Sequence, residues 1–234
     1  ELLETLKETL KSIQTKNPLT HCITNSVTIN DCANASLAIG GSPLMAEDIA
    51  ELEEIETIAD ALVINIGTLT KPQIESMKFA AKAANNTNTP IILDPVGVGV
   101  SRLRNDTTLD LIENNDIAAI RGNISEIKAI AKLTGLIDEN NAAKGVDVNI
   151  DDIITEENLK SNGKIIRELA EKLDTTILAS GPIDILSDGE TTIAIDNGDD
   201  MMPLITGSGC MLSSIVGSCI GGSNPFDGTL VAIL

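Results

Sequence analysis

The chain has 234 residues, of which 42% are hydrophobic, and a formal net charge of −19 at pH 7. Nucleic-acid phosphates and anionic membrane headgroups would repel so acidic a protein, so we expect neither as a partner. The sequence contains two Phe and no Trp or Tyr, so the core must be aliphatic and stacking on single-stranded bases is almost excluded. The length and the lack of a linker-like stretch predict one domain over residues 1–234.

The first half of the chain shows helical apolar spacing interrupted by short apolar runs. In chain order the predicted elements are helices over residues 2–14 and 25–39, a strand over 61–66, a helix over 71–84 and a strand over 90–93. Asn25 or Ser26 would cap the second helix, and the pair Gly40-Gly41 would end it. Pro72 suits the first turn of the third helix.

The second half continues the alternation of helices and strands. The predicted elements are helices over 107–114, 125–133, 156–173 and 209–220, and strands over 117–120, 176–179 and 191–195. The pair Asp188-Gly189 marks a hairpin turn. Residues 135–152 are polar and irregular and are expected to be mobile, and a last helix is expected to be incomplete at Leu234. The alternation predicts an α/β fold with a mostly parallel central sheet and helices on both faces.

One uncharged stretch and the cysteines bear on where the protein works. Residues 201–226 carry no charge, but Gly, Ser and Pro crowd them and Asp200 and Asp227 flank them. A buried core helix therefore fits this stretch better than a membrane span. The four cysteines form no CxxC pair, which argues against a zinc or redox motif. With no signal peptide visible, reduced thiols and a cytoplasmic location are expected.

The segment Thr206-Gly207-Ser208-Gly209-Cys210 stands directly before an apolar helical run. Its glycines allow positive φ and close approach to a ligand. The free N–H groups and the dipole of the following helix would then attract an anion, and Gly209 is predicted to contact a nucleotide phosphate. Cys210 at this helix start is expected to have a lowered pKa. The alternative is that Cys210 is a small buried residue at a tight helix entry.

Four apolar runs each end in a polar residue, as expected for parallel strands that reach one sheet edge. The residues that follow these runs are Asn65, Asp94, Arg121 and Ser180. Ligands of open α/β folds bind at this edge, and an anion site facing a carboxylate and an arginine predicts phosphoryl transfer. No GxxxxGK[ST] and no GxGxxG after a strand occurs, so neither a P-loop nor a dinucleotide fingerprint is present.

Several of these residues have a structural reading beside the functional one. Asp94 would bind Mg²⁺ through water, or it is a turn residue before a proline. Arg121 and Glu126 would bind phosphate and metal, or would pair with each other. The polar side chains of Asn25, Asn30 and Asn34 would hold a small polar molecule or cap loops. We predict Asn25 as a substrate contact.

His21 is the sole histidine. His21 and Cys210 could form a thiol–imidazole pair for covalent catalysis. No third orienting group is evident from the sequence, so a structural role for His21 is favoured.

These motifs together resemble the hydroxyethylthiazole kinase family of the ribokinase-like superfamily. The segments that carry the resemblance are PLTHCITN at 18–25, AN at 33–34, GSPLM at 41–45, NIGTL at 65–69, DPV at 94–96, RGN at 121–123 and TGSGC at 206–210. The resemblance implies a ribokinase-like fold and phosphorylation of 4-methyl-5-(2-hydroxyethyl)thiazole by ATP and Mg²⁺ in thiamine salvage. It also implies a homotrimer with active sites between subunits.

The resemblance assigns roles to individual positions of this chain. It places Met45 and Gly207 at the thiazole, Arg121 and Ser180 at ATP, and Asp94 and Glu126 near magnesium. Cys210 stands where most relatives of the superfamily carry a catalytic aspartate. Ser180 stands at a position where threonine is also common in the family, and either residue supplies a hydroxyl group. The sequences of the family are expected to extend past Leu234.

Loose phosphoryl-transfer transition states put charge on equatorial oxygens and need little base strength, so a cysteine is tolerable as a weak general base. The alternatives are another kinase of the superfamily, for a hydroxymethylpyrimidine or a sugar, or a nucleotide-sensing module without catalysis. The cysteine in place of aspartate argues against the first alternative, and turnover of ATP that depends on the thiazole alcohol would exclude the second.

Overall fold

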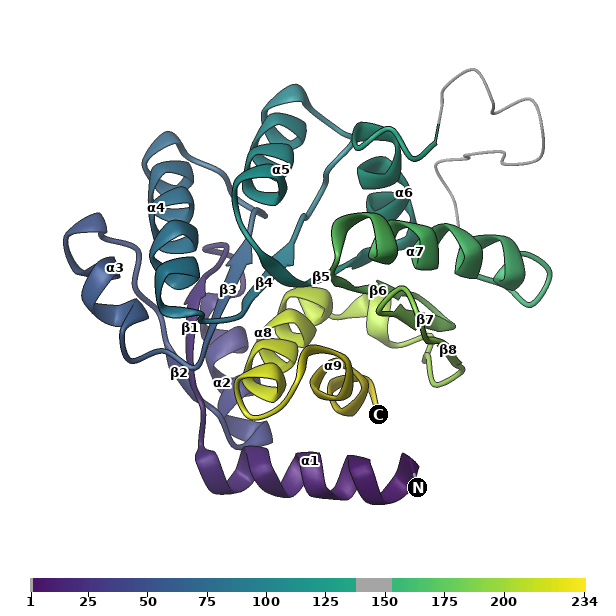
Figure 1. The fold of residues 1–234 in the computed structure, drawn as a ribbon, viewed down its shortest axis with the longest axis horizontal. Coiled ribbons are helices and arrows are strands. Elements are labelled where there is room, and N and C mark those ends of the chain that lie inside the picture. The colour runs from purple at the N-terminus through teal and green to yellow at the C-terminus, as the bar shows by residue number, and fades with distance from the viewer. Residues whose placement is uncertain (1, 138–152) are drawn as a thin grey trace.

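The computed structural model describes residues 2–137 and 153–234, which form one twisted sheet between two layers of helices (Figure 1). Within these residues the sheet has eight strands in the order β2-β1-β3-β4-β5-β6-β7-β8. The strands are β1 (Leu19–Ile23), β2 (Ser42–Leu44), β3 (Ala61–Asn65), β4 (Ile91–Asp94), β5 (Ile117–Asn123), β6 (Thr176–Ser180), β7 (Asp184–Ser187) and β8 (Thr192–Ile195). The strands β1 to β6 pair in parallel, and β7 and β8 are antiparallel. This confirms the predicted α/β fold.

The helices divide between the two faces of the sheet, as Figure 1 shows. One face carries α3 (Ile49–Glu56), α4 (Lys71–Thr87), α5 (Arg102–Asn114), α6 (Ile124–Leu133) and α7 (Leu159–Leu173). The other face carries α1 (Leu2–Lys16), α2 (Ile29–Ile39), α8 (Ser208–Gly221) and α9 (Pro225–Ile233). Parallel strands covered on both faces bury both sets of side chains. The uncharged α8 lies against β1, β3 and β4, as expected of a buried core helix.

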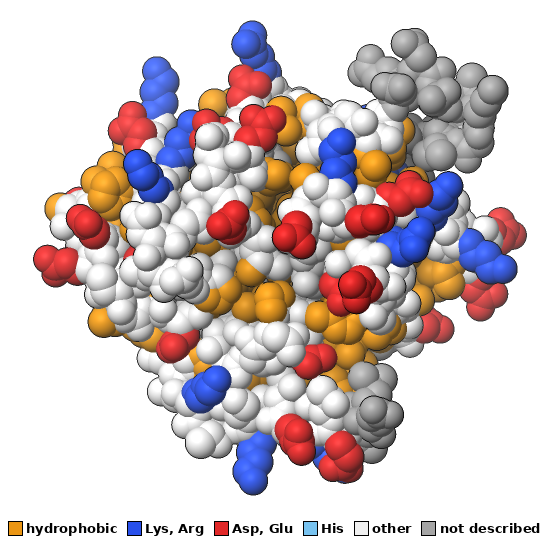
Figure 2. Space-filling model, viewed as in Figure 1, with side chains coloured by type: hydrophobic (Ala, Val, Ile, Leu, Met, Phe, Trp, Pro, Cys, Tyr) orange, Lys and Arg blue, Asp and Glu red, His pale blue; other side chains and the backbone are white. Residues whose placement is uncertain are grey.

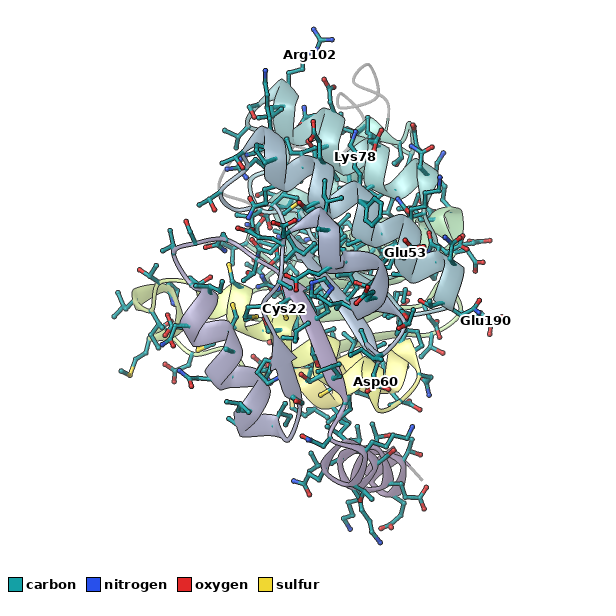
Figure 3. The ribbon with its side chains drawn as sticks, turned by 90° about the vertical axis from the view of Figure 1, so that its left-hand side faces the viewer. Cys22, Glu53, Asp60, Lys78, Arg102 and Glu190 are labelled. Carbon is teal, nitrogen blue, oxygen red and sulfur yellow. The ribbon has the colours of Figure 1, made fainter. Side chains whose placement is uncertain are left out.

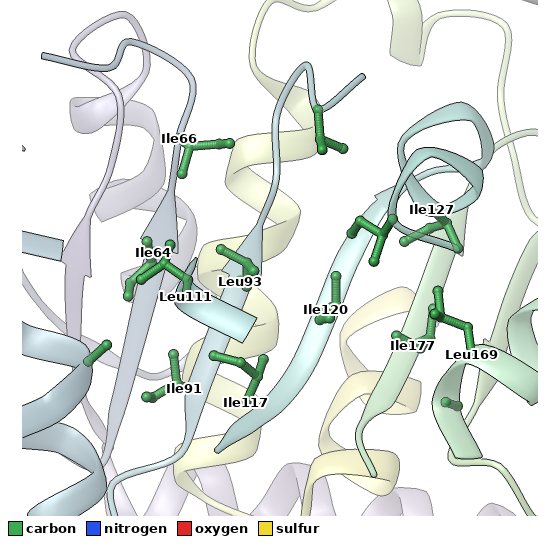
Figure 4. Close-up of a cluster of buried hydrophobic side chains, with 14 of the residues drawn as sticks. Ile64, Ile66, Ile91, Leu93, Leu111, Ile117, Ile120, Ile127, Leu169 and Ile177 are labelled. Carbon is green, nitrogen blue, oxygen red and sulfur yellow. The ribbon is translucent and has the colours of Figure 1, made fainter. Parts of the chain in front are cut away.

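The core is aliphatic on both sides of the sheet, as the composition predicts. The larger cluster packs strand residues such as Ile64, Leu93 and Ile120 against α4 to α7 (Figure 4). The second cluster packs Val63 and Ile92 against α8 and α9. Alternate residues of each strand therefore belong to opposite clusters. The described helices include none long and apolar enough to cross a membrane.

The sequence did not predict β1, β2 and α3, and it predicted β7 only as the first arm of the hairpin at Asp188-Gly189. The helix expected to be incomplete at Leu234 is α9, which was predicted without bounds. The strand β1 contains His21 and Thr20, which are polar yet buried, and β2 has three residues, too few for a periodic signal. The helix α9 follows α8 after a short turn capped by Asn224, whose side chain accepts from Asp227 N.

Some predicted boundaries were wrong. The helix α2 begins at Ile29 and not at Asn25 or Ser26, because the Asn25 side chain accepts from Val27 N and forms a turn. The helix α7 begins at Leu159, after a turn over 156–158. Gly40 ends α2 with φ 104° as predicted. Most of the segment 135–152, predicted to be mobile, lies outside the described residues.

The acidity is a property of the whole visible surface. On the face shown in Figure 2, Asp and Glu side chains are spread among Lys and Arg and do not gather at one place. The large negative charge therefore does not mark a single acidic site on this face.

Candidate active site

Polar residues gather at the carboxyl edge of the parallel strands. Asn65 and Asp94 end neighbouring strands and are partners in the register of β3 and β4. Ser180 ends β6 opposite Asn123 of β5. Arg121 differs from its predicted position, because β5 continues past it to Asn123. The side chain of Arg121 nevertheless reaches the same edge, where it contacts Ser180.

Asp94 is fully buried at the end of β4. Its Oδ2 accepts hydrogen bonds from Asn65 Nδ2 and Ser213 Oγ, both over 2.7 Å, and lies 3.9 Å from Arg121 Nη1. Burial raises the pKa of Asp94 to about 6, although Arg121 and these hydrogen bonds act to lower it. Its Oδ1 is buried with no hydrogen-bond partner among the described residues. A cation or its water ligand would satisfy this oxygen.

A chain of side-chain amides joins Asp94 to Cys210. Asn25 Nδ2 donates to Asn65 Oδ1 over 3.0 Å and to Cys210 Sγ over 3.1 Å, and Asn65 Nδ2 donates to Asp94. The backbone fixes both amide orientations, because Asn25 Oδ1 accepts from Val27 N and Asn65 Oδ1 accepts from Gly67 N. The predicted substrate contact Asn25 is therefore also an orienting residue for Cys210.

The pKa of Cys210 is raised and not lowered, which corrects the sequence prediction. Burial is the largest cause, and the nearby charge of Asp94 adds to it. Hydrogen bonds from Asn65, Thr28 and Asn25 oppose this rise without outweighing it. The helix start alone would favour the thiolate, but desolvation and a like charge dominate here. Cys210 therefore holds its proton at neutral pH.

Arg121 links the start of α8 to β6. Its Nη2 donates to Ser180 Oγ over 2.5 Å, and the guanidinium lies so close to Gly209 that a Cβ there would be 2.5 Å from Nη1. Arg121 Nε is buried without a partner among the described residues. The guanidinium, Ser180 and the helix start thus form one cationic and donor-rich surface.

The amides at the start of α8 are available to an anion. Ser208 N donates to Ile205 O over 3.3 Å, and Met211 N donates to Gly207 O. Within the described residues the amides of Gly209 and Cys210 have no hydrogen-bond acceptor. A helix of this length presents such free N–H groups to an anion at its positive end. The predicted anion site is therefore limited to the amides of Gly209 and Cys210, because Ser208 N already donates to Ile205 O.

Glu126 serves first as a helix cap. Its Oε2 accepts from Asn123 N and its Oε1 accepts from Gly97 N, both over 2.8 Å, and with Asn123 it forms a capping box for α6. Its charge also acts on Asp94, whose pKa it raises. Glu126 is therefore near Asp94, but backbone amides already occupy both of its oxygens. It does not pair with Arg121, whose hydrogen bond goes to Ser180.

The two predicted thiazole residues lie in different parts of the chain. Gly207 has φ 78° and its backbone lies against Thr28, whose Cγ2 would be 2.1 Å from a Cβ at this position. Met45 follows β2, is half-buried and packs against the second core cluster. A glycine at 207 is thus required both by the backbone conformation and by the lack of space.

His21 and the remaining asparagines stand outside the site. His21 is fully buried; its Nδ1 lies 2.5 Å from Glu56 Oε1 and its Nε2 2.9 Å from Ala46 O. Both ring nitrogens are engaged, so none is left to pair with Cys210. Asn30 and Asn34 are exposed and not buried, which removes the reason for expecting them to bind a ligand.

Two residues of the site were missed from the sequence. Ser213 donates to Asp94, and Thr28 contacts Gly207 and Cys210. Ser213 lies four residues after Gly209 on α8, which places both on one helix face. That spacing was the available signal, while nothing in the sequence indicated Thr28.

A cavity of about 630 Å³ lies elsewhere, at the opposite edge of the sheet. Its lining includes Asp116 before β5 and Thr175 before β6. It contains none of the predicted site residues, so cavity size does not identify the site.

Comparison with known proteins shows the family to which the chain belongs. The model of the hydroxyethylthiazole kinase family matches residues 10–233. A hydroxyethylthiazole kinase from Methanobrevibacter smithii is 68% identical over 234 residues, which cover 100% of this chain and 82% of that protein.

Solved structures agree as well. A hydroxyethylthiazole kinase protein from Pyrococcus horikoshii OT3 superposes with a TM-score of 0.85 at 35% identity, covering 98% of this chain and 82% of the other. A ribokinase-like superfamily protein from Enterococcus faecalis V583 has a TM-score of 0.59 at 12% identity over 92% of this chain and 75% of the other, which supports the ribokinase-like fold alone. The chain belongs to the hydroxyethylthiazole kinase family.

Proposed function

We propose that this protein transfers the γ-phosphoryl group of ATP to the hydroxyl group of 4-methyl-5-(2-hydroxyethyl)thiazole, as part of thiamine salvage. The observation that carries the proposal is the juxtaposition of Arg121, Ser180 and the free amides at the start of α8 beside Cys210. This is a donor-rich surface for phosphates with the residue at the catalytic position on its border. Family membership names the acceptor alcohol.

The chain's own groups would stabilise the charge that develops on the transferred phosphoryl group. Amides of Gly209 and Cys210 are preorganised by α8, and the Arg121 guanidinium is held by Ser180. Donors already aimed at the oxygens need no reorganisation during the reaction. Because the transition state is loose, positioning and charge stabilisation matter more than covalent chemistry.

We propose that Mg²⁺ is the required metal and that Asp94 is its main protein contact. The unsatisfied, buried Oδ1 of Asp94 fits a cation or its water. The described residues include no cluster of three or more His, Cys, Asp or Glu side chains that could hold a metal. Mg²⁺ is usually bound by one or two carboxylates together with water and substrate phosphates. A site with Asp94 as its single direct carboxylate contact therefore fits Mg²⁺. When bound, the metal would neutralise phosphate charge, and Glu126 would act through water.

We propose that Cys210 is a weak base that acts late in transfer and is not a nucleophile; only the small thiolate fraction that its raised pKa leaves at neutral pH can accept the alcohol proton. The Asn25 amide holds its sulfur at the start of α8. No imidazole is available to activate a thiolate, because His21 binds Glu56 and Ala46.

We also propose a homotrimer with active sites between subunits. Exposed apolar side chains occur in two segments beside the site, namely Val27, Ile29, Leu37, Met201, Met202, Leu204 and Ile205. The contact of Thr28 with Gly207 places these segments side by side. Contiguous exposed apolar surface of this kind is typical of subunit interfaces. We also propose a cytoplasmic location, which the four unpaired thiols support.

Sedimentation velocity at micromolar concentration tests the assembly. The unmodified protein is expected to sediment as a trimer and Leu204→Asp as smaller species. Ile58→Asp, a matched control at an exposed residue between α3 and β3, should leave the trimer intact. A fully active monomer would contradict the proposal.

A coupled assay of ADP release tests the activity. ADP release should depend on the thiazole alcohol and should exceed release with a hydroxymethylpyrimidine or a sugar under equal conditions. The Arg121→Ala variant, purified in parallel, controls for contaminating kinases. Thiazole-independent ADP release would exclude the proposed acceptor, and nucleotide binding without turnover would favour a sensing role.

A further inference from the structure

Arg104 lies in the first turn of α5, but its guanidinium points into the protein. Nη1 donates to Ile66 O over 2.6 Å and to Val96 O over 2.5 Å, and Nη2 donates to Gly67 O over 2.8 Å. The side chain is half-buried. The three acceptors are backbone carbonyls, so these bonds hold backbone and do not pair with a carboxylate.

These carbonyls belong to two loops that leave the carboxyl edge of the sheet. Ile66 and Gly67 follow directly on Asn65 at the end of β3, and Val96 follows two residues after Asp94 at the end of β4. The loops are also joined by the hydrogen bond from Ile66 N to Asp94 O over 3.2 Å. Arg104 therefore connects the loop that follows Asn65 to the loop that follows Asp94.

The backbone of the second loop is shaped around the arginine. Gly97 has φ 72°, and a Cβ there would lie 3.3 Å from Arg104 Cδ. Gly97 N in turn donates to Glu126 Oε1. The same loop thus contacts Arg104 on one side and the Glu126 carboxylate on the other.

The geometry of the contact requires a guanidinium. Its planar fork can donate in several fixed directions at once, whereas the ammonium group of lysine is a single compact charge. Hydrogen bonds from a charged donor are also stronger than neutral ones. Lysine would keep the charge and lose the bridge between the loops.

We propose that Arg104 is a positioning residue that fixes the loops after β3 and β4 and so holds Asn65 and Asp94 in place for the metal and the nucleotide. The inference rests on the proposed function for its catalytic consequence. Its structural part concerns the two loops and holds whatever the substrate is.

The test compares Arg104→Lys with Arg102→Lys. Arg102 is in the same helix turn, but its side chain is 92% exposed and pairs with Asp106, and Figure 3 shows it projecting from the protein. Hydrogen exchange of the ligand-free proteins should be at least threefold faster over residues 66–69 and 96–100 in Arg104→Lys. The Arg102→Lys variant should match the unmodified protein.

Binding and kinetics supply the second readout. In Arg104→Lys, Mn²⁺ bound together with ADP, measured by electron paramagnetic resonance, should bind about tenfold more weakly. The KM for ATP and the Mg²⁺ requirement should rise while the KM for the thiazole alcohol stays within twofold. A merely stabilising role would lower the melting temperature and leave the Mn²⁺ affinity unchanged at 20 °C, which would overturn the proposal.

Failure of the inference and failure of the proposed function are separable. Unchanged exchange in the two loops of Arg104→Lys overturns the inference even if the enzyme is active. Absence of thiazole phosphorylation in the unmodified protein overturns the proposed function, while faster loop exchange and weaker Mn²⁺ binding would still support the role of Arg104.

Discussion

The side-chain amide of Asn25 donates a hydrogen bond to the sulfur of Cys210 over 3.1 Å. The same amide nitrogen donates to Asn65, which donates to Asp94. The Cys210 thiol is therefore connected to the buried carboxylate of Asp94. This connection does not make Cys210 acidic, because burial and the charge of Asp94 raise its pKa.

Replacement of Cys210 tests whether this position acts as a base. Cys210→Asp should keep or raise turnover, because a carboxylate can accept the alcohol proton and the Asn25 amide can donate to it. Cys210→Ala should lower kcat by about 10²–10⁴-fold, the usual range for loss of a general base. The raised thiol pKa favours the lower end of that range. Steady-state kinetics with both substrates saturating measure the effect.

Covalent catalysis would give the opposite pattern, with both variants inactive. The base role is wrong if Cys210→Asp is inactive while circular dichroism shows it folded and calorimetry shows that both substrates bind.

The buried carboxylate of Asp94 is expected to lower the stability of the folded protein while it provides the contact for the metal. Its pKa is raised from 3.8 to about 6 mainly by burial, so above pH 6 the folded protein holds a carboxylate that the unfolded chain solvates better. Two units of pKa correspond to about 3 kcal/mol. Asp94→Asn should therefore raise the free energy of unfolding at pH 7.5 by up to about 3 kcal/mol. It should also abolish detectable turnover, because the metal loses its contact.

The effect of Asp94 on the free energy of unfolding should depend on pH. The destabilisation by Asp94 is complete above pH 6 and shrinks as the pH falls toward 3.8, the pKa of the unfolded chain, below which the folded and the unfolded chain are both protonated. The stability advantage of Asp94→Asn, measured by urea unfolding without metal, should shrink over that range. An advantage that stays constant from pH 7.5 to pH 4 would contradict the assigned pKa.

Arg121→Ala should weaken ATP binding far more than thiazole binding. Its guanidinium is held by Ser180 and lies beside Gly209 at the start of α8. Loss of one charge-assisted phosphate contact should reduce the affinity by about 1.5–3 kcal/mol. Isothermal titration calorimetry measures both ligands, and Ser180→Ala, which frees the guanidinium without removing it, should have a smaller effect. Unchanged affinity for ATP in Arg121→Ala would refute the assignment.

Gly209→Ala should reduce ATP affinity through Arg121. The added Cβ would lie 2.5 Å from Arg121 Nη1, so the guanidinium must move. Alanine is a better helix former than glycine, so the melting temperature should change little. Titration with ATP should show a loss that is largely absent when the same substitution is made in the Arg121→Ala background. Additive losses in the double variant would show that the two residues act separately.

Much of the site could be predicted because parallel strands deliver their following residues to one edge. Asn65, Asp94 and Ser180 end β3, β4 and β6 as the apolar runs indicated. The anion site at the start of α8 followed from its glycines, since Gly207 has the positive φ that favours this residue. The roles assigned to these residues in binding ATP, metal and thiazole remain predictions.

The sequence by itself determined the α/β class, the aliphatic core, the start of α8 and the strand ends, because these depend on local periodicity, composition and glycine conformation. Only the tertiary structure decided the protonation of Cys210, the role of Glu126 as a helix cap and the contacts of Ser213, Thr28 and Arg104. Burial and the distances between residues far apart in the chain set these properties. The helix start predicted an acidic thiol, but burial raises the pKa of Cys210 instead, and the carboxylate of Asp94, 116 positions away in the sequence, adds to that rise.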